Sequence, residues 1–181
     1  MNMSLVISTI IGGLLMLAMI GLNTRVSQSS SIKTLQFATK AKVDVIAAYV
    51  TADIRQVGAG IGTGNKIEQV TQNRLTFRRT RIDGVTETVQ WRWVPDAGVA
   101  TSPNPRDRRL YRIVGTDTTD FGNGIVSFQF RFLEADGDST LTVADIRSIR
   151  ARVIVESDVS FQNEWARSFW ESTVTPRGLQ N

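Results

Sequence analysis

Three acidic side chains that alternate along a short segment are the first candidates for chemistry in this sequence. Glu134, Asp136 and Asp138 lie in the stretch EADGDST, and carboxylates at alternate positions suit a hard cation such as calcium. The order differs from that of an EF-hand loop, because Gly137 lies between the second and third acids. A solvated hairpin turn accounts for the same residues. We keep calcium binding as an alternative to a plain turn, and we expect no other cofactor.

Arginines gather between residues 74 and 112. This stretch contains nine arginines and four acidic residues, a local net charge of 9 − 4 = +5. Interleaved with Trp91, Trp93 and Tyr111, they are compatible with phosphate contacts and base stacking, and thus with nucleic-acid binding. Arginines that alternate with apolar residues are also typical of the solvent face of a strand, or they can pair with acids of a neighbouring subunit. Nucleic acid is therefore a possible partner of the Arg74–Arg112 region, but not the expected one.

The composition excludes several classes of site. The chain of 181 residues has no Cys and no His, which removes disulfides, Cys/His zinc sites and Ser-His-Asp triads. Catalysis by paired carboxylates needs two acids in one pocket, and no spacing in the sequence indicates such a pair. We therefore do not expect an enzyme.

An uncharged segment precedes all of these candidate residues in the sequence. Residues 4–22 read SLVISTIIGGLLMLAMIGL, and 19 residues of helix rise about 28 Å, close to the thickness of a bilayer core. A cleaved signal peptide would have a basic start and a shorter apolar stretch. The segment therefore predicts a retained hydrophobic helix, inserted in a membrane or in a protein environment that replaces one.

Small residues recur on this predicted helix at four-residue spacing, which favours close packing between helices, although Gly and Ser are also common in membrane helices generally. The residues that we expect in such contacts are Ser4, Ser8, Gly12, Gly13, Leu14, Leu15, Leu17 and Ile20.

Residues 23–31 are polar and weak helix formers, so they predict a flexible or locally unwound hinge. From Ile32 two apolar stripes resume at helical spacing, and together they predict a wide face that covers a sheet. One stripe consists of Leu35, Ala38, Val45, Ala48 and Ala52, and the other of Ile46, Val50, Ile54 and Val57. A run of alternate glycines from Gly58 to Gly64 ends the helix.

After residue 65 the apolar period changes to two. The alternating stretches predict antiparallel strands with one buried face at residues 75–78, 89–93, 126–132 and 149–155, with further strands around Tyr111 and Ile113 and at 165–174. The predicted fold class is α+β, a long N-terminal helix packed on an antiparallel sheet. We expect an apolar helix and hinge at 1–31, an amphipathic stalk and glycine corner at 32–64, and a β-domain at 65–181.

This arrangement resembles the type IV pilin fold, and three local motifs add to the resemblance. The helix end DIRQVG is similar to the D-x-R-x-x-G of larger minor pilins and type II secretion minor pseudopilins. The stretch DIRSIRARVIV is similar to a late strand of theirs, and TVTPRGL to their closing T-x-V-x-P-R-N-L. The matched residues are Asp53, Arg55, Gly58, Arg147, Arg150, Pro176 and Arg177.

The sequence also departs from the family pattern. Pilins are made with a basic leader that is cut after a Gly, and the mature chain carries Glu at its fifth position. Here the sequence opens Met1-Asn2-Met3, and no acidic residue precedes Asp44. We therefore expect the N-terminal helices to bundle by apolar packing instead of the usual charge pairing. Processing and methylation of the N-terminus are left open.

The resemblance implies a structural subunit of an extracellular or envelope-spanning filament, inserted in the inner membrane before assembly at the cell surface. Its partners would be copies of itself, with other pilins as an alternative. One alternative is a minor pilin or pseudopilin at the tip of a type IV pilus or secretion apparatus, and another is a monomeric membrane-anchored binding domain. Asp53 and Arg55 are expected to be structural, with Lys42 or Lys66 as possible tertiary partners of Asp53.

Overall fold

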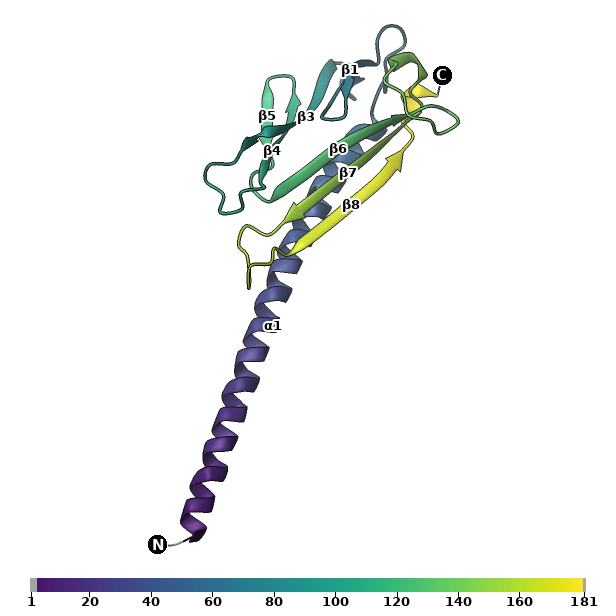
Figure 1. Cartoon of the computed structure of the whole chain (residues 1–181). Coiled ribbons are helices and arrows are strands. Elements are labelled where there is room, and N and C mark those ends of the chain that lie inside the picture. Colours follow the sequence, from purple (N-terminus) through teal and green to yellow (C-terminus); the bar gives the residue numbers. More distant parts are fainter. Residues whose placement is uncertain (1–2, 181) are drawn as a thin grey trace.

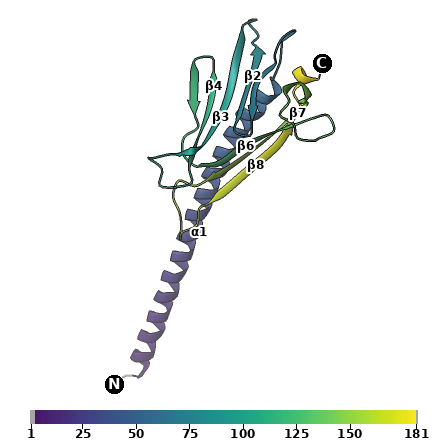
Figure 2. The same ribbon diagram turned by 45° about the horizontal axis from the view of Figure 1, so that its top comes forward.

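The computed structural model describes residues 3–180, with the side chains of all but Ser4 and Leu5. One helix, α1 (Met3–Arg55), runs from the N-terminus into a domain made of two antiparallel sheets. The N-terminal half of α1 projects far beyond the sheets (Figures 1 and 2). At 1.5 Å per residue, its 53 residues span about 80 Å. The α+β class with a long N-terminal helix is confirmed.

The helix is continuous through residues 23–31, so the predicted local unwinding is not found there. The polar side chains of this region bond back to the helix itself. Hydroxyls donate to carbonyl oxygens four residues earlier, from Thr24 to Ile20 at 2.9 Å and from Ser31 to Ser27 at 3.0 Å. Because these hydroxyls are satisfied within the helix, they do not compete for the backbone groups that an unwound segment would expose.

Only one of the two predicted stalk stripes is buried. Ile46, Val50, Ile54 and Val57 have no exposed surface. In the other stripe, by contrast, Leu35 is half-buried and the remaining members are exposed: Ala38, Val45, Ala48 and Ala52. The prediction of a wide covered face is therefore wrong in this half, because the sheets meet the helix along a single narrow strip.

The larger sheet has the strand order β1-β2-β3-β4-β5 and the smaller one β6-β7-β8. The strands of the larger sheet are β1 (Ile67–Thr71), β2 (Arg74–Thr80), β3 (Thr86–Gly98), β4 (Arg108–Val114) and β5 (Asp117–Asp120). Those of the smaller sheet are β6 (Ile125–Leu133), β7 (Ser148–Glu156) and β8 (Arg167–Val174), and short 3₁₀ turns lie at Val143–Asp145 and Arg177–Leu179. The edge strands β1 and β5 are short and polar, and the apolar period did not predict them.

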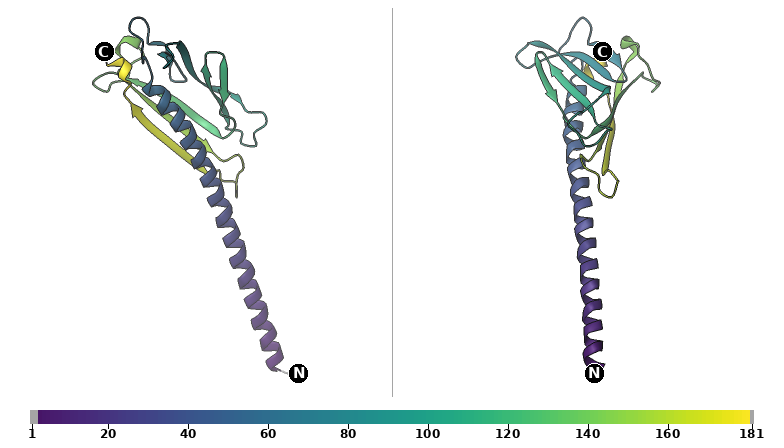
Figure 3. Two further views of the ribbon diagram at one scale, coloured as in Figure 1. Left: turned by 180° about the vertical axis from the view of Figure 1, so that it is seen from behind. Right: turned by 60° about the vertical axis from the view of Figure 1, so that its left-hand side comes forward.

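The core lies where the two sheets and the C-terminal half of α1 meet. Strands β7 and β8 lie along the helix, and the larger sheet flanks it (Figure 3). The rings of Trp91 and Phe128 stack at 5.9 Å between centroids and join the two sheets, while Phe121 stacks on Trp91 at 5.3 Å. The helix thus contributes one narrow apolar strip to a core built mainly from strands.

The end of the helix and the end of the chain pack against each other. Gly58 has a left-handed φ of +70° and donates its amide to the Arg78 carbonyl at 3.0 Å. Gly178 lies against this corner so closely that a Cβ on it would lie 2.5 Å from the Gly58 carbonyl carbon and would also overlap the Val57 carbonyl oxygen. Two of the three pilin-like motifs therefore meet in space, although 120 residues separate Gly58 from Gly178.

Gly178→Ala should destabilise the domain by about 1–3 kcal/mol, because the added methyl overlaps backbone atoms that cannot turn away. The measurement is urea unfolding of the full-length protein in detergent, followed by tryptophan emission. Gly62→Ala is the matched control, since a Cβ there meets nothing within 4 Å. Equal midpoints for the two variants would contradict this packing.

Candidate functional site: the exposed apolar helix and its ionic anchor

The N-terminal half of α1 is apolar and exposed at the same time. Every residue from 6 to 27 is exposed, and by length and composition this helix can cross a membrane. The predicted contact residues lie within it. Leu14, Leu15, Leu17 and Ile20 are exposed by 53–67%. Ser8, Gly12 and Gly13 are exposed as well, whereas the side chain of Ser4 lies outside the described residues.

A second uncharged surface continues along the stalk beside the β-domain. We call it the open seam: Thr34, Ala38, Ala41, Val45, Ala48 and Ala52, all exposed. Their spacing alternates between four and three residues, as in the a and d positions of a heptad. Because the buried strip occupies the other side of the helix, the open seam points away from both sheets. Mostly small side chains would allow a second helix to approach closely.

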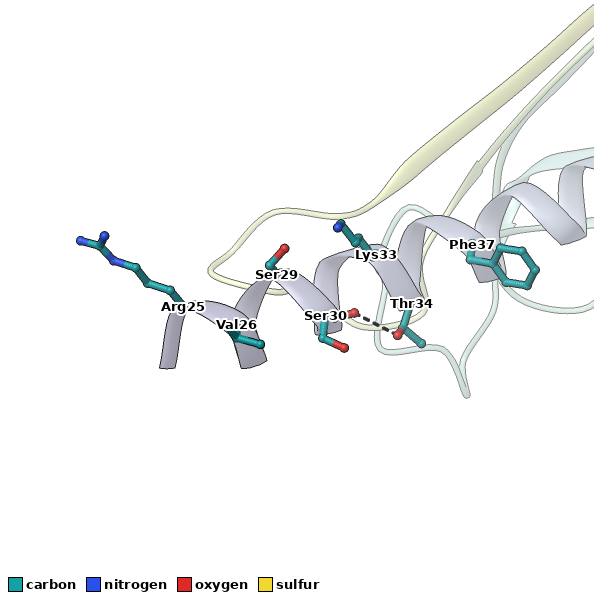
Figure 4. Close-up of a pocket in the computed structure, with 7 residues that line it drawn as sticks. All are labelled: Arg25, Val26, Ser29, Ser30, Lys33, Thr34 and Phe37. Carbon is teal, nitrogen blue, oxygen red and sulfur yellow. Dashed lines mark hydrogen bonds between the residues drawn. The ribbon is translucent and has the colours of Figure 1, made fainter. Parts of the chain in front are cut away.

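A shallow groove lies between these two surfaces, on the bare part of the stalk (Figure 4). Its seven lining residues all come from one helix: Arg25, Val26, Ser29, Ser30, Lys33, Thr34 and Phe37. The Thr34 hydroxyl donates to the Ser30 carbonyl at 2.9 Å, and Phe37 is 77% exposed. Because a single helix provides all of its lining residues, this groove lacks the enclosure that a small-molecule site needs.

Asp53 anchors the helix end to the larger sheet. Its carboxylate is 2% exposed and accepts two hydrogen bonds from Arg112, at 2.6 and 2.9 Å. The indole nitrogen of Trp91 donates to the same carboxylate at 2.8 Å. A bidentate guanidinium and an indole therefore compensate the burial of this charge.

A second arginine extends the network. Arg79 donates to Asp53 at 3.2 Å, to Glu87 at 2.7 Å and to the side-chain oxygen of Gln56 at 2.5 Å. Arg79 and Glu87 are both largely buried. The helix and strands β2, β3 and β4 thus share one ionic junction, formed by Asp53, Arg79, Glu87 and Arg112.

Aromatic side chains close the junction on its other side. The Arg112 guanidinium lies 5.6 Å from the Tyr49 ring centroid, and Tyr49 meets Phe121 edge-on at 5.8 Å. The hydrogen bond to Asp53 raises the pKa of Arg112 above its ordinary value, burial acts against this, and the charge of Asp53 adds to the increase. Arg112 therefore stays charged, as the anchor requires.

The predicted structural role of Asp53 agrees with this geometry, but the predicted partners are wrong. Its oxygens accept from arginines and Trp91, and from neither Lys42 nor Lys66. Burial lowers the pKa of the Lys42 amine, while the carboxylates of Asp158, Asp107 and Asp120 act in the opposite direction.

Sequence reasoning missed both arginine partners, although a signal for them was present. On β2, Arg79 has the same parity as the buried Leu75 and Phe77, and on β4, Arg112 has the same parity as the buried Leu110. Alternate residues point to the same face, so an arginine in phase with buried residues indicates a buried partner. The prediction around Tyr111 and Ile113 instead used the opposite face of β4, whose residues are only half-buried.

The acidic segment after β6 forms a closed turn. The Gly137 amide donates to the Glu134 carbonyl at 3.2 Å, and the Asp138 amide donates to the Asp136 carboxylate at 3.2 Å. Among residues 3–180, no group of three or more acidic side chains is arranged to hold a metal ion. The two hydrogen bonds and the bridge between Leu133 and Ser139 are those of the hairpin-turn alternative.

Most arginines of the Arg74–Arg112 region find acids within their own chain, which reduces the case for nucleic acid there. Arg78 pairs with Glu68, and Arg81 with Asp83. Arg106 pairs with the buried Glu156 at 2.9 Å. The hydrogen bond between Arg109 and Asp120 raises the pKa of that exposed arginine. Together with Arg79 and Arg112, six of the nine are paired in this way.

The remaining motif residues support the strand ends and the C-terminal turn. Arg147 donates to the carbonyl oxygens of Ala144 and Ile146 at 2.7 and 3.0 Å. Pro176 is buried, while Arg55 and Arg177 are exposed. Arg150 alternates with the buried Ile149 and Ala151 on β7 and donates to the Thr173 hydroxyl at 3.0 Å.

Comparison with protein-family models and with curated proteins found no match for this chain.

Proposed function

We propose that this chain is a pilin-like structural subunit of an extracellular or envelope-spanning filament. The observation that carries the proposal is the N-terminal half of α1, which is apolar over residues 4–22 yet exposed at every residue from 6 to 27. Such a surface is stable only when lipid or other apolar helices cover it. Helices of further copies provide that cover in a filament core.

The open seam supports the same proposal. It extends the uncharged surface from the apolar segment up to Ala52, beside the β-domain. Lipid tails are as apolar as the side chains of residues 4–22, so for that segment the gain on leaving the membrane comes from close packing between helices with small residues. Copies that pack along α1 would hold the β-domains outside the core.

The ionic junction at Asp53 gives the proposed subunit a rigid connection. A filament under load transmits force from the helix core to the outer domains. The junction fastens the end of α1 to three strands through buried charged hydrogen bonds. In this proposal the chain starts in the inner membrane, ends in a filament at the cell surface, and needs neither a catalytic site nor a cofactor.

Electron microscopy of filaments sheared from cells, combined with mass spectrometry of their subunits, tests this function. We expect filaments in which this chain is the main component. Trace amounts in filaments made of another protein would instead indicate a minor pilin or pseudopilin at a tip. A monomer that stays in the membrane fraction would indicate an anchored binding domain, and either result would overturn the proposal.

A further inference from the structure

The solvent-exposed side of the smaller sheet carries arginines that have no close ion-pair partner among residues 3–180. Strands β6, β7 and β8 turn their apolar side chains towards the core and the helix, among them the buried Phe130, Ala151 and Val153. Figure 1 looks onto the opposite face, which no other element covers in that view. We call it the outer face: Gln129, Arg131, Arg150, Arg152, Arg167, Phe169 and Glu171.

Arginines on this face outnumber acids. Arg131 and Arg150 are direct cross-strand partners, a like-charge arrangement that destabilises a sheet. Their Nε atoms donate to neutral hydroxyls, Arg131 to Ser139 at 2.5 Å and Arg150 to Thr173 at 3.0 Å. An anion placed between the two guanidinium groups would relieve the repulsion.

One carboxylate serves two of these arginines, and only distantly. Glu171 lies 3.9 Å from Arg150 and 3.8 Å from Arg152, and all three side chains are 40–51% exposed. Glu156, the cross-strand partner of Arg167, is buried and already paired with Arg106. Four arginines against Glu171 leave a net charge of 4 − 1 = +3 on the outer face.

An exposed aromatic ring completes this surface. Phe169 is 70% exposed although it lies within β8. It takes part in none of the ring pairs found among residues 3–180. Its cross-strand partner is Ile154, two residues from Arg152 on the same face. From Phe169 to Arg131 the path crosses two strand spacings and four residues, about 16 Å along a diagonal.

We propose that the outer face binds single-stranded nucleic acid, with phosphates on Arg131, Arg150 and Arg152 and a base stacked on Phe169. Arginines supply the sequence-independent attraction, and an exposed ring supplies a platform that every base can use. A single strand fits better than a duplex, because the face presents no helix to enter a groove and carries a ring that needs an unstacked base. The inference does not depend on filament formation, since this face is open in the single chain.

The test is fluorescence anisotropy of a labelled oligo-dT of about 15 nucleotides with the full-length protein in a non-ionic detergent. Three to four phosphate contacts predict a slope of log K against log salt between about −2 and −3. Arg131→Gln and Arg150→Gln should each reduce the slope by about 0.7. Phe169→Ala should weaken binding about five-fold or more and leave the slope unchanged.

Arg81→Gln is the matched control, because Arg81 is 57% exposed on a hairpin of the other sheet and its loss removes the same charge. Circular dichroism should show that each variant is folded. Several results would overturn the inference: no binding of oligo-dT at low salt, an equal loss in Arg81→Gln, or unchanged binding in Phe169→Ala. Equal binding of duplex DNA, or equal competition by polyphosphate or poly-glutamate, would also exclude a site for single strands.

Discussion

Asp53→Ala should lower the free energy of unfolding of the β-domain by about 3–5 kcal/mol, the largest effect that we expect from a single polar side chain in this protein. The substitution leaves the largely buried Arg112 without its carboxylate and the Trp91 indole without an acceptor. Urea unfolding of the full-length protein in detergent measures the loss. Tryptophan emission is a suitable signal because Trp91 contacts Asp53 directly.

Two further variants serve as comparisons: one keeps the volume of the Asp53 side chain without its charge, and the other removes an exposed carboxylate from the same helix. Asp53→Asn retains an oxygen that can accept from Trp91 but removes the charge, so its cost should lie between wild type and Asp53→Ala. Asp44→Ala removes a carboxylate from the same helix whose ion pair with Lys40 is exposed, and it should change stability by no more than about 1 kcal/mol. If Asp53→Ala cost no more than Asp44→Ala, the junction would not be the anchor of the helix.

Ala48→Glu should reduce the yield of filaments by at least about ten-fold and leave the β-domain folded. Ala48 lies in the middle of the open seam and is exposed in the single chain, so the domain tolerates a longer polar side chain there. In a packed bundle of helices, however, each copy would bury an unpaired carboxylate, which costs several kcal/mol. The measurement is the amount of this chain in sheared filaments, with urea unfolding of the extracted protein as the check on folding.

Ala48→Ser is the control at the same position, because it stays small and uncharged and should retain filaments. Wild-type filament yields from Ala48→Glu would show that the open seam is not part of the core, even if filaments form through residues 4–22. Absence of filaments in the wild type would be a different result, since it contradicts the proposed function itself.

Apolar alternation along the sequence predicted some of the strands and missed others. Period-two alternation predicted β6 and β7 and the central part of β3, where buried and outward residues alternate along long stretches. It missed β1 and β5, because a short edge strand buries little and therefore has no apolar period to detect. On β4 it chose Tyr111 and Ile113 over Leu110 and Arg112, since an inward arginine breaks the apolar pattern.

The stalk shows the same limit for the helix. Both stripes of the segment after Ile32 are apolar, and nothing local distinguishes the stripe that the sheets cover from the open seam. Likewise, residues 23–31 look like a hinge from helix propensity alone, but their hydroxyls are satisfied within the helix. Helix propensity is a small energy per residue, which the context of a long continuous helix can override.

The amino-acid sequence by itself determined that an uncharged helical segment at residues 4–22 leads into an amphipathic helix and that antiparallel strands follow, because apolar periodicity depends only on the order of residues along the chain. It also predicted that residues 4–22 form a helix long and apolar enough to cross a membrane. Only the tertiary structure decided that Asp53 meets Arg79 and Arg112, that Gly178 packs on the helix end, and that the arginines of β6 and β7 share an open face. These contacts join residues far apart in the sequence, so the packing of the helix and the two sheets decides which of them meet.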